Sequence, residues 1–168
     1  NYWKEIKAIR SLENVDWNPL IAKSVQIKRQ IVNADFKEKN LRKTLNFGHT
    51  IGHALESYSM KHHQDPLKHG EAVAAGMVTE LFLSVGIIGF PVPQMEAIVD
   101  FILLHFNLSK LEFDIKEILS LISHDKKTVG KDTHFVLLKD IGYPVIHNQP
   151  EEQEIRDALQ FTLNRFHQ

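Results

Sequence analysis

The sequence HGEAVAAGMVTELFLSV, residues 69–85, is apolar on almost every side of a helix from Ala72 to Val85. A surface helix carries one apolar stripe, whereas a helix that is apolar all round is buried. We therefore predict that this segment forms a buried helix in the core of the fold.

Apolar residues at helical spacing continue on both sides of this segment. They predict helices over residues 17–33, 41–60, 94–106, 115–123 and 151–166. The spacing changes in THFVLL and YPVIHN, which are separated by KDIG and predict a β-hairpin, and HDKKTVGKD before them is expected to be a turn. The predicted fold class is mainly α: one multi-helical domain over residues 1–168 with one small β-hairpin.

The composition is that of an ordinary globular protein, with 168 residues of which 43% are hydrophobic and 24% charged. The formal net charge of -1 gives no electrostatic attraction to nucleic acid or an anionic membrane, so local cations must bind any anionic substrate. Cysteine is absent, which excludes disulfides and thiolate metal ligands. No stretch approaches the ~20 apolar residues of a membrane span. We expect a cytoplasmic protein with no nucleic-acid or membrane partner.

The segment LRKTLNFGHTIGHALE, residues 41–56, is the most informative for function. On one continuous helix its polar residues Arg42, Asn46, His49, His53 and Glu56 would share a narrow stripe. A solvated polar face would show the same pattern. Such faces are usually built from Lys, Glu, Gln and Ser, so the arginine, asparagine and histidines favour a functional face.

Two glycines interrupt the same segment, and each costs about 1 kcal/mol relative to alanine in a helix interior. Gly48 and Gly52 lie four residues apart and remove side chains from one side of the helix. They allow a bound molecule or another backbone to approach closely, or they serve tight helix packing alone. The sequence leaves both explanations open.

Several histidines are candidate metal ligands, because neutral imidazole binds zinc. His49 and His53 at spacing i,i+4 could share one metal, or one could be a ligand while the other transfers protons. His69, at the start of the next helix, is a third candidate. His62 and His63 lie in a polar segment and are expected to be exposed rather than ligands.

Cationic residues suggest how an acidic substrate is bound. Lys28 lies within an apolar arc of its helix, so its ammonium either snorkels to solvent or points into a cavity. Lys126 lies in a segment where lysines are normally solvated. Together with Arg42, the two lysines would complete a cationic pocket for an acidic, phosphorylated small molecule. Glu56 and Glu71 are candidates to orient the imidazoles.

Taken in order, Lys28, LRKTLNFGHTIGHALE, KHGEAVAAGM and DKKTVGKDTHFVLLKDIG resemble the C-terminal domain of the 3-dehydroquinate synthase family. The resemblance covers residues 28–142. It implies an enzyme of the shikimate pathway, a lyase dependent on NAD and a divalent metal. This lyase converts 3-deoxy-D-arabino-heptulosonate 7-phosphate, a phosphorylated sugar acid, to 3-dehydroquinate and phosphate.

The resemblance also implies roles for single residues. His49 and His69 would be ligands of the metal, zinc or cobalt. His53 and Lys28 would be catalytic, with His53 moving protons around the alcohol that is oxidised. The residues implied to bind the carboxylate, hydroxyls and phosphate of the substrate are Lys28, Arg42, Asn46 and Lys126.

Two parts of the family's pattern do not occur in these residues. The third zinc ligand belongs to an AEVIK-like stretch, and the nucleotide-binding glycine motif belongs to an N-terminal domain. We therefore expect the C-terminal domain of a longer, homodimeric protein, inactive by itself. The alternatives are a related sugar-phosphate cyclase, a polyol or iron-type alcohol dehydrogenase, and a non-catalytic helical zinc-binding module.

Overall fold

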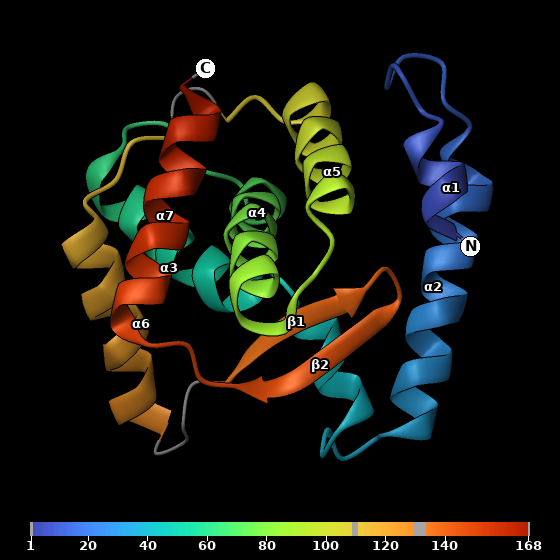
Figure 1. Ribbon diagram of the computed structural model, residues 1–168. Helices are drawn as coiled ribbons and strands as arrows, with labels where there is room; N and C mark the ends of the chain where they lie inside the picture. Colours follow the sequence, from blue (N-terminus) through green and yellow to red (C-terminus); the bar gives the residue numbers. More distant parts are fainter. Residues whose placement is uncertain (1, 109–110, 130–133, 168) are drawn as a thin grey trace. The chain divides into compact units, whose positions relative to one another are not determined.

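The structure is a computed structural model that describes residues 2–108, 111–129 and 134–167, with the backbone alone described for 124–129. It confirms the predicted fold class, mainly helical with one hairpin (Figure 1). The elements are α1 Tyr2–Lys7, α2 Trp17–Ala34, a 3-10 helix η1 Leu41–Asn46, α3 His49–His62, α4 His69–Ile88, α5 Val92–His105, α6 Ile115–Val129, β1 Phe135–Asp140, β2 Tyr143–Asn148 and α7 Glu152–Phe166.

The chain divides into two compact units, Asn1–Asn46 and Phe47–Gln168. The organisation as one domain stays a prediction. In the first unit, α1 lies against α2, and the Tyr2 hydroxyl donates a hydrogen bond to the Leu20 carbonyl at 2.7 Å. Helix α2 begins after Asp16, whose carboxylate accepts a hydrogen bond from a backbone N–H in the first turn.

The centre of the second unit is α4, which confirms the predicted buried helix. Helices α3, α5 and α7 and strand β1 all contact α4, and Figure 1 shows it between them. By length and composition α4 could cross a membrane, contrary to the expectation from sequence. Because 61% of its most apolar window is buried inside the protein, α4 has the character of a core helix.

The hairpin is antiparallel, with Phe135 opposite Asn148 and Leu137 opposite Val145, and confirms the strand prediction. Its turn contains Gly142 in the left-handed region at φ 85°. The hairpin is tied to the core because the backbone N–H of Leu138 donates to the hydroxyl of Ser84 on α4 at 3.0 Å.

Helix α6 is longer than the sequence predicts. It continues to Val129, so the expected turn in HDKKTVGKD is wrong for residues 124–129. Lys126 therefore lies on a helix, and its side chain lies outside the described residues. Lysine is a good helix former, and an apolar spacing that ends at residue 123 does not itself end a helix.

Candidate functional site

The predicted single helix over residues 41–60 is wrong, because the chain breaks at Gly48. The 3-10 helix η1 ends at Asn46, Gly48 has φ 81°, and α3 begins at His49. A continuous α-helix requires φ near −63° at every residue. The polar stripe drawn across Gly48 therefore does not exist. Arg42 and Asn46 belong to the first compact unit and the histidines to the second.

Within the first unit, Arg42 and Asn46 converge on one carboxylate, that of Glu38. Arg42 Nε lies 3.5 Å from Glu38 Oε2, and Asn46 Nδ2 donates to Glu38 Oε1 at 3.4 Å. An arginine and an amide side by side form a carboxylate-binding pair. Lys28 is exposed on α2.

Asp35 positions the chain that leads into this pair. Its carboxylate accepts hydrogen bonds from the backbone N–H groups of Asn40, Lys39 and Arg42, at 2.7, 3.0 and 3.1 Å. These bonds hold the pKa of the Asp35 carboxyl below its usual value, because they favour its charged form. The half-buried carboxylate of Asp35 thus fixes the loop between α2 and η1.

In the second unit, the structure brings the three candidate histidines together. His49 and His53 come from the first two turns of α3, and His69 comes from the start of α4. Their ring centroids are 5.5 Å apart for His49 and His53, 5.7 Å for His49 and His69, and 5.8 Å for His53 and His69. His49 is half-buried and the other two are exposed, so the cluster is open to small solutes.

Glu56, one turn beyond His53, fixes the ring of His69. Its Oε2 lies 3.1 Å from His69 Nδ1 across the gap between α3 and α4. When the carboxylate accepts from Nδ1–H, the other ring nitrogen, Nε2, keeps its lone pair for a metal. Glu71 makes no such contact and instead accepts from the backbone N–H of Lys68 at 2.8 Å, which caps its own helix.

The donor set fits a divalent metal, but the coordination shell is not complete within the described residues. With a Zn–N distance near 2.0 Å, two imidazoles on one tetrahedral ion have centroids about 5 Å apart, close to the separations of this cluster. No three His, Asp or Glu side chains in the described parts of the chain close around one ion. Within the described residues, these histidines would thus provide only part of a coordination shell.

The neighbouring histidines have structural contacts. His62 Nε2 lies 3.0 Å from Glu117 Oε1, and His63 Nδ1 lies 3.0 Å from the Ser59 hydroxyl. Hydrogen bonds from His62 and Lys61 hold the pKa of the Glu117 carboxyl below its usual value. His62 is exposed, as the sequence led us to expect, whereas His63 is half-buried.

The glycines serve close packing of α3 on α4. A Cβ on Gly52 would lie 3.0 Å from the Cα of Val73, and a Cβ on Gly76 would collide with the carbonyl oxygen of Gly48. The backbones of the two helices therefore touch where they cross, which no larger residue permits. Among the two explanations that the sequence left open, packing accounts for both Gly48 and Gly52.

Sequence reasoning missed Glu80, a fully buried carboxyl group on α4. Its Oε2 accepts a hydrogen bond from the backbone N–H of Gly48 at 2.7 Å. Burial raises the pKa of Glu80 to about 8, although the N–H groups of Gly48, Ile51 and Thr50 oppose the shift. A glutamate inside an otherwise apolar helix was a visible signal.

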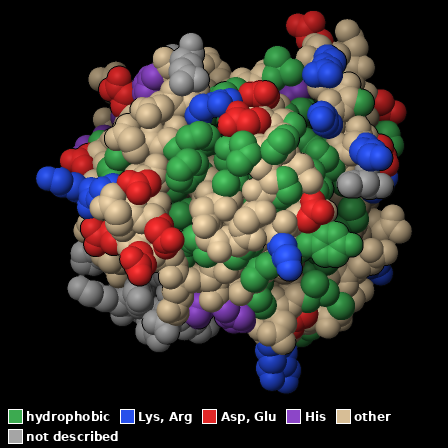
Figure 2. Space-filling view, in the orientation of Figure 1, with side chains coloured by type: hydrophobic (Ala, Val, Ile, Leu, Met, Phe, Trp, Pro, Cys, Tyr) green, Lys and Arg blue, Asp and Glu red, His purple; other side chains and the backbone are tan. Residues whose placement is uncertain are grey.

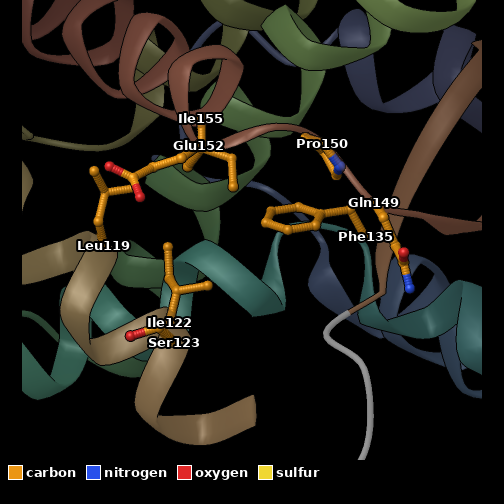
Figure 3. A pocket seen from close by; sticks show the side chains of 8 residues that line it. All are labelled: Leu119, Ile122, Ser123, Phe135, Gln149, Pro150, Glu152 and Ile155. Carbon is orange, nitrogen blue, oxygen red and sulfur yellow. The ribbon is translucent and has the colours of Figure 1, made fainter.

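A cavity of about 210 Å³ lies between α6, β1 and α7 (Figure 3), and none of the predicted site residues lines it. Its lining is mainly apolar and comprises Leu119, Ile122, Ser123, Phe135, Gln149, Pro150, Glu152 and Ile155. On the face shown in Figure 2, basic and acidic side chains are interspersed, in keeping with the small net charge.

Two solved structures share the fold. A 2-deoxy-scyllo-inosose synthase complexed with carbaglucose-6-phosphate, NAD+ and Co2+ matches with a TM-score of 0.69 and 24% identity, over 84% of this chain and 39% of that one. The 2-epi-5-epi-valiolone synthase of Streptomyces hygroscopicus subsp. jinggangensis, with NAD+ and Zn2+ bound, matches with a TM-score of 0.71 and 21% identity, over 88% and 40%.

Curated relatives are closer in sequence. The 3-dehydroquinate synthase of Parabacteroides distasonis is 41% identical over 152 residues, which are 89% of this chain and 42% of that protein. That of Leptospira interrogans is 41% identical over 165 residues, 94% of this chain and 44% of that protein. The chain thus spans about two fifths of the length of these relatives. The family described as 3-dehydroquinate synthase C-terminal matches residues 1–128, and the chain belongs to that family.

Proposed function

We propose that the chain is the metal- and substrate-binding part of a 3-dehydroquinate synthase. The complete protein would convert 3-deoxy-D-arabino-heptulosonate 7-phosphate to 3-dehydroquinate and phosphate. The observation that carries this proposal is the cluster of three imidazoles, in which Glu56 orients His69. Family membership supports the reaction, and the cluster would supply the metal ligands and the proton acceptor that the reaction needs.

His49 and His69 would hold the divalent metal, zinc or cobalt, with a third ligand from the N-terminal part of the complete protein. When bound, this ion supplies Lewis acidity toward the substrate hydroxyls. The contribution of Glu56 is to keep the proton of His69 on Nδ1, which leaves Nε2 as the donor atom. Aspartate, glutamate and histidine ligands also accept other divalent ions, so the protein selects its metal by geometry and availability.

His53 would move protons at the secondary alcohol that NAD oxidises transiently. Imidazole is the side chain that most often takes and returns a proton in catalysis. His53 lies 5.5 Å from His49 and 5.8 Å from His69, measured between ring centroids. A proton acceptor at this distance from the two proposed ligands would serve a hydroxyl bound beside them.

The anionic substrate would be bound by Lys28, Arg42, Asn46 and Lys126, with Lys28 also assisting catalysis. The contact of Arg42 and Asn46 with Glu38 supports a role in binding a carboxylate. In this proposal the substrate's carboxylate replaces that of Glu38. A neutral polyol would gain nothing from these cations, which argues against a polyol dehydrogenase.

We further propose that NAD is bound mainly by the N-terminal part and that the 168-residue chain alone is inactive. The complete protein would be a cytoplasmic homodimer. Its partner would be the phosphorylated sugar acid, with no nucleic acid and no membrane.

The test is an assay of the complete protein, with this chain joined to its N-terminal part. It should release phosphate from the heptulosonate phosphate and form dehydroquinate only when NAD and a divalent metal are both present. A matched His49→Ala protein should release none. Phosphate release from a different sugar phosphate alone would instead establish a sister cyclase. Metal binding without any phosphate release would establish a zinc-binding module.

A further inference from the structure

Glu80 is a carboxyl group with no exposed surface, on the same helix that begins with His69. None of the described basic side chains pairs with it, and its Oε1 has no hydrogen-bond partner among the described residues. Burying a carboxyl group without a cation costs free energy. This cost must be offset by an interaction that an apolar side chain could not make.

The other carboxyl oxygen of Glu80 caps a neighbouring helix. Helix α3 begins after Gly48, which has no side chain and so makes no side-chain cap. The first N–H groups of a helix need acceptors, which an N-cap side chain usually supplies. Here Glu80 Oε2 accepts from Gly48 N–H at 2.7 Å, and the N–H groups of Thr50 and Ile51 face the same carboxyl group.

This cap joins the two helices that carry the histidine cluster. His49 is the first residue of α3 and follows Gly48 directly, while His69 begins α4, which also carries Glu80. The close crossing at Gly76 places the two backbones in contact. The hydrogen bond from Gly48 to Glu80 therefore sets where α3 starts relative to α4, and with it the position of the His49 ring.

We propose that Glu80 is a positioning residue for the histidine cluster, holding His49 in register with His69 through the backbone of Gly48. The inference rests on the proposed function of this cluster as a metal site. It extends that function, because the partners of Glu80 are backbone N–H groups at the start of α3 and not the metal-binding side chains. Glu80 acts on the backbone at the buried start of α3. Glu56, in contrast, contacts the ring of His69 directly.

The test compares three variants of the complete protein with one matched control. Glu80→Ala removes the cap, Glu80→Asp shortens it by one methylene, and Glu80→Gln keeps a carbonyl acceptor for Gly48. The control is Thr79→Val, an equally buried change on α4 that breaks the 2.8 Å hydrogen bond to Thr162 on α7. Both Thr79→Val and Glu80→Ala lose a buried hydrogen bond, but that of Thr79 runs to α7, whereas that of Glu80 runs to Gly48 at the start of α3.

The readouts are the Co2+ affinity, from chelator competition, and the ring nitrogen signals of the histidines in metal-free protein. Glu80→Ala should weaken Co2+ binding by about tenfold or more, as losses of supporting partners at metal sites do. Glu80→Gln should recover most of that affinity. Thr79→Val should lower the melting temperature and leave both the affinity and the ring signals unchanged.

Two results would overturn the inference. One is an unchanged Co2+ affinity and unchanged ring signals in folded Glu80→Ala. The other is an equal loss in Glu80→Ala and Thr79→Val, which would show general destabilisation. If Glu80→Ala does not fold, Glu80→Asp takes its place, and wild-type affinity in that variant would contradict the inference. If the wild-type protein binds no metal, the proposed function fails, whereas the ring signals still test the position of His49.

Discussion

Glu56 on α3 holds the ring of His69 on α4 through a contact of 3.1 Å between Oε2 and Nδ1. The glutamate is partly shielded, with 22% of its side chain exposed, whereas the histidine side chain is 56% exposed. The exposed imidazole of His69 is thus held at Nδ1 by a carboxylate that is partly shielded from solvent. This relationship selects which nitrogen of His69 faces outward.

Removing this anchor should weaken metal binding. Glu56→Ala should lower the Zn2+ affinity of the complete protein by roughly 10–100-fold, because His69 loses the partner that fixes its orientation and tautomer. Competition with a chelator measures the change. Glu71→Gln is the matched control, since that residue caps its own helix, and its affinity should match wild type. Equal affinities in all three proteins would show that Glu56 does not orient His69.

The three histidines should separate by role when each is changed to alanine. His49→Ala and His69→Ala should each abolish measurable metal binding at micromolar concentration, because each removes a proposed ligand. His53→Ala should keep the metal and lower the turnover rate by about 100-fold or more, the scale of general acid–base catalysis. Metal content and steady-state rates measure both effects. A metal loss in His53→Ala equal to that in the other two would reassign His53 as a ligand.

The raised pKa of Glu80 predicts how the free energy of unfolding depends on pH. Its folded pKa of about 8 lies above the ordinary value of 4.5, so the folded protein holds a proton that the unfolded chain has released. The contribution of Glu80 to the free energy of unfolding is therefore fully present below pH 4.5 and is lost as the pH rises toward 8. Each pKa unit is worth about 1.4 kcal/mol.

Urea unfolding at pH 5 and pH 8 measures this dependence. Glu80→Gln cannot titrate and should show a smaller loss of unfolding free energy between the two pH values than the wild type. Asp35 and Glu117 do not confuse the comparison, because their lowered pKa values affect stability at acid pH. If the unfolding free energy changed equally between pH 5 and pH 8 in the wild type and in Glu80→Gln, Glu80 would be ionised throughout this range.

The helix crossing should not tolerate a methyl group at Gly76. Gly76→Ala would place a Cβ against the Gly48 carbonyl, and relieving the collision should cost roughly 1–3 kcal/mol of unfolding free energy. Gly86 lies on the same helix with open space around it, so Gly86→Ala should stabilise by about 0.5–1 kcal/mol. Denaturant unfolding measures both. A stabilising Gly76→Ala would contradict the close crossing of α3 and α4.

Arg42 should govern substrate binding more than its neighbour. Arg42→Ala in the complete protein should raise the KM for the heptulosonate phosphate by about tenfold or more, because it removes a charge-assisted hydrogen bond to the anion. Lys43→Ala removes the same formal charge one residue away and should leave KM within about twofold, because a charge without a direct contact to the anion acts weakly across solvent. Equal changes would indicate a general charge effect instead of a specific contact.

The sequence alone determined the class of fold and the identity of the chemical groups. An apolar segment such as residues 72–85 has only one favourable place, the core, because every side of its helix avoids water. The hairpin followed from a local change of period and a glycine turn. The histidines stood out by residue type, since no solvated helix face requires them.

Only the tertiary structure decided how these groups are arranged. Helical spacing predicted one stripe from Arg42 to Glu56, but Gly48 takes a left-handed φ that suits its contact with α4, so the stripe is broken. The partners of His69 and Gly48 are Glu56 and Glu80, which lie 13 and 32 residues away along the chain. Contacts across such separations depend on how two helices cross, and that crossing is set by packing between segments, which local periodicity does not contain.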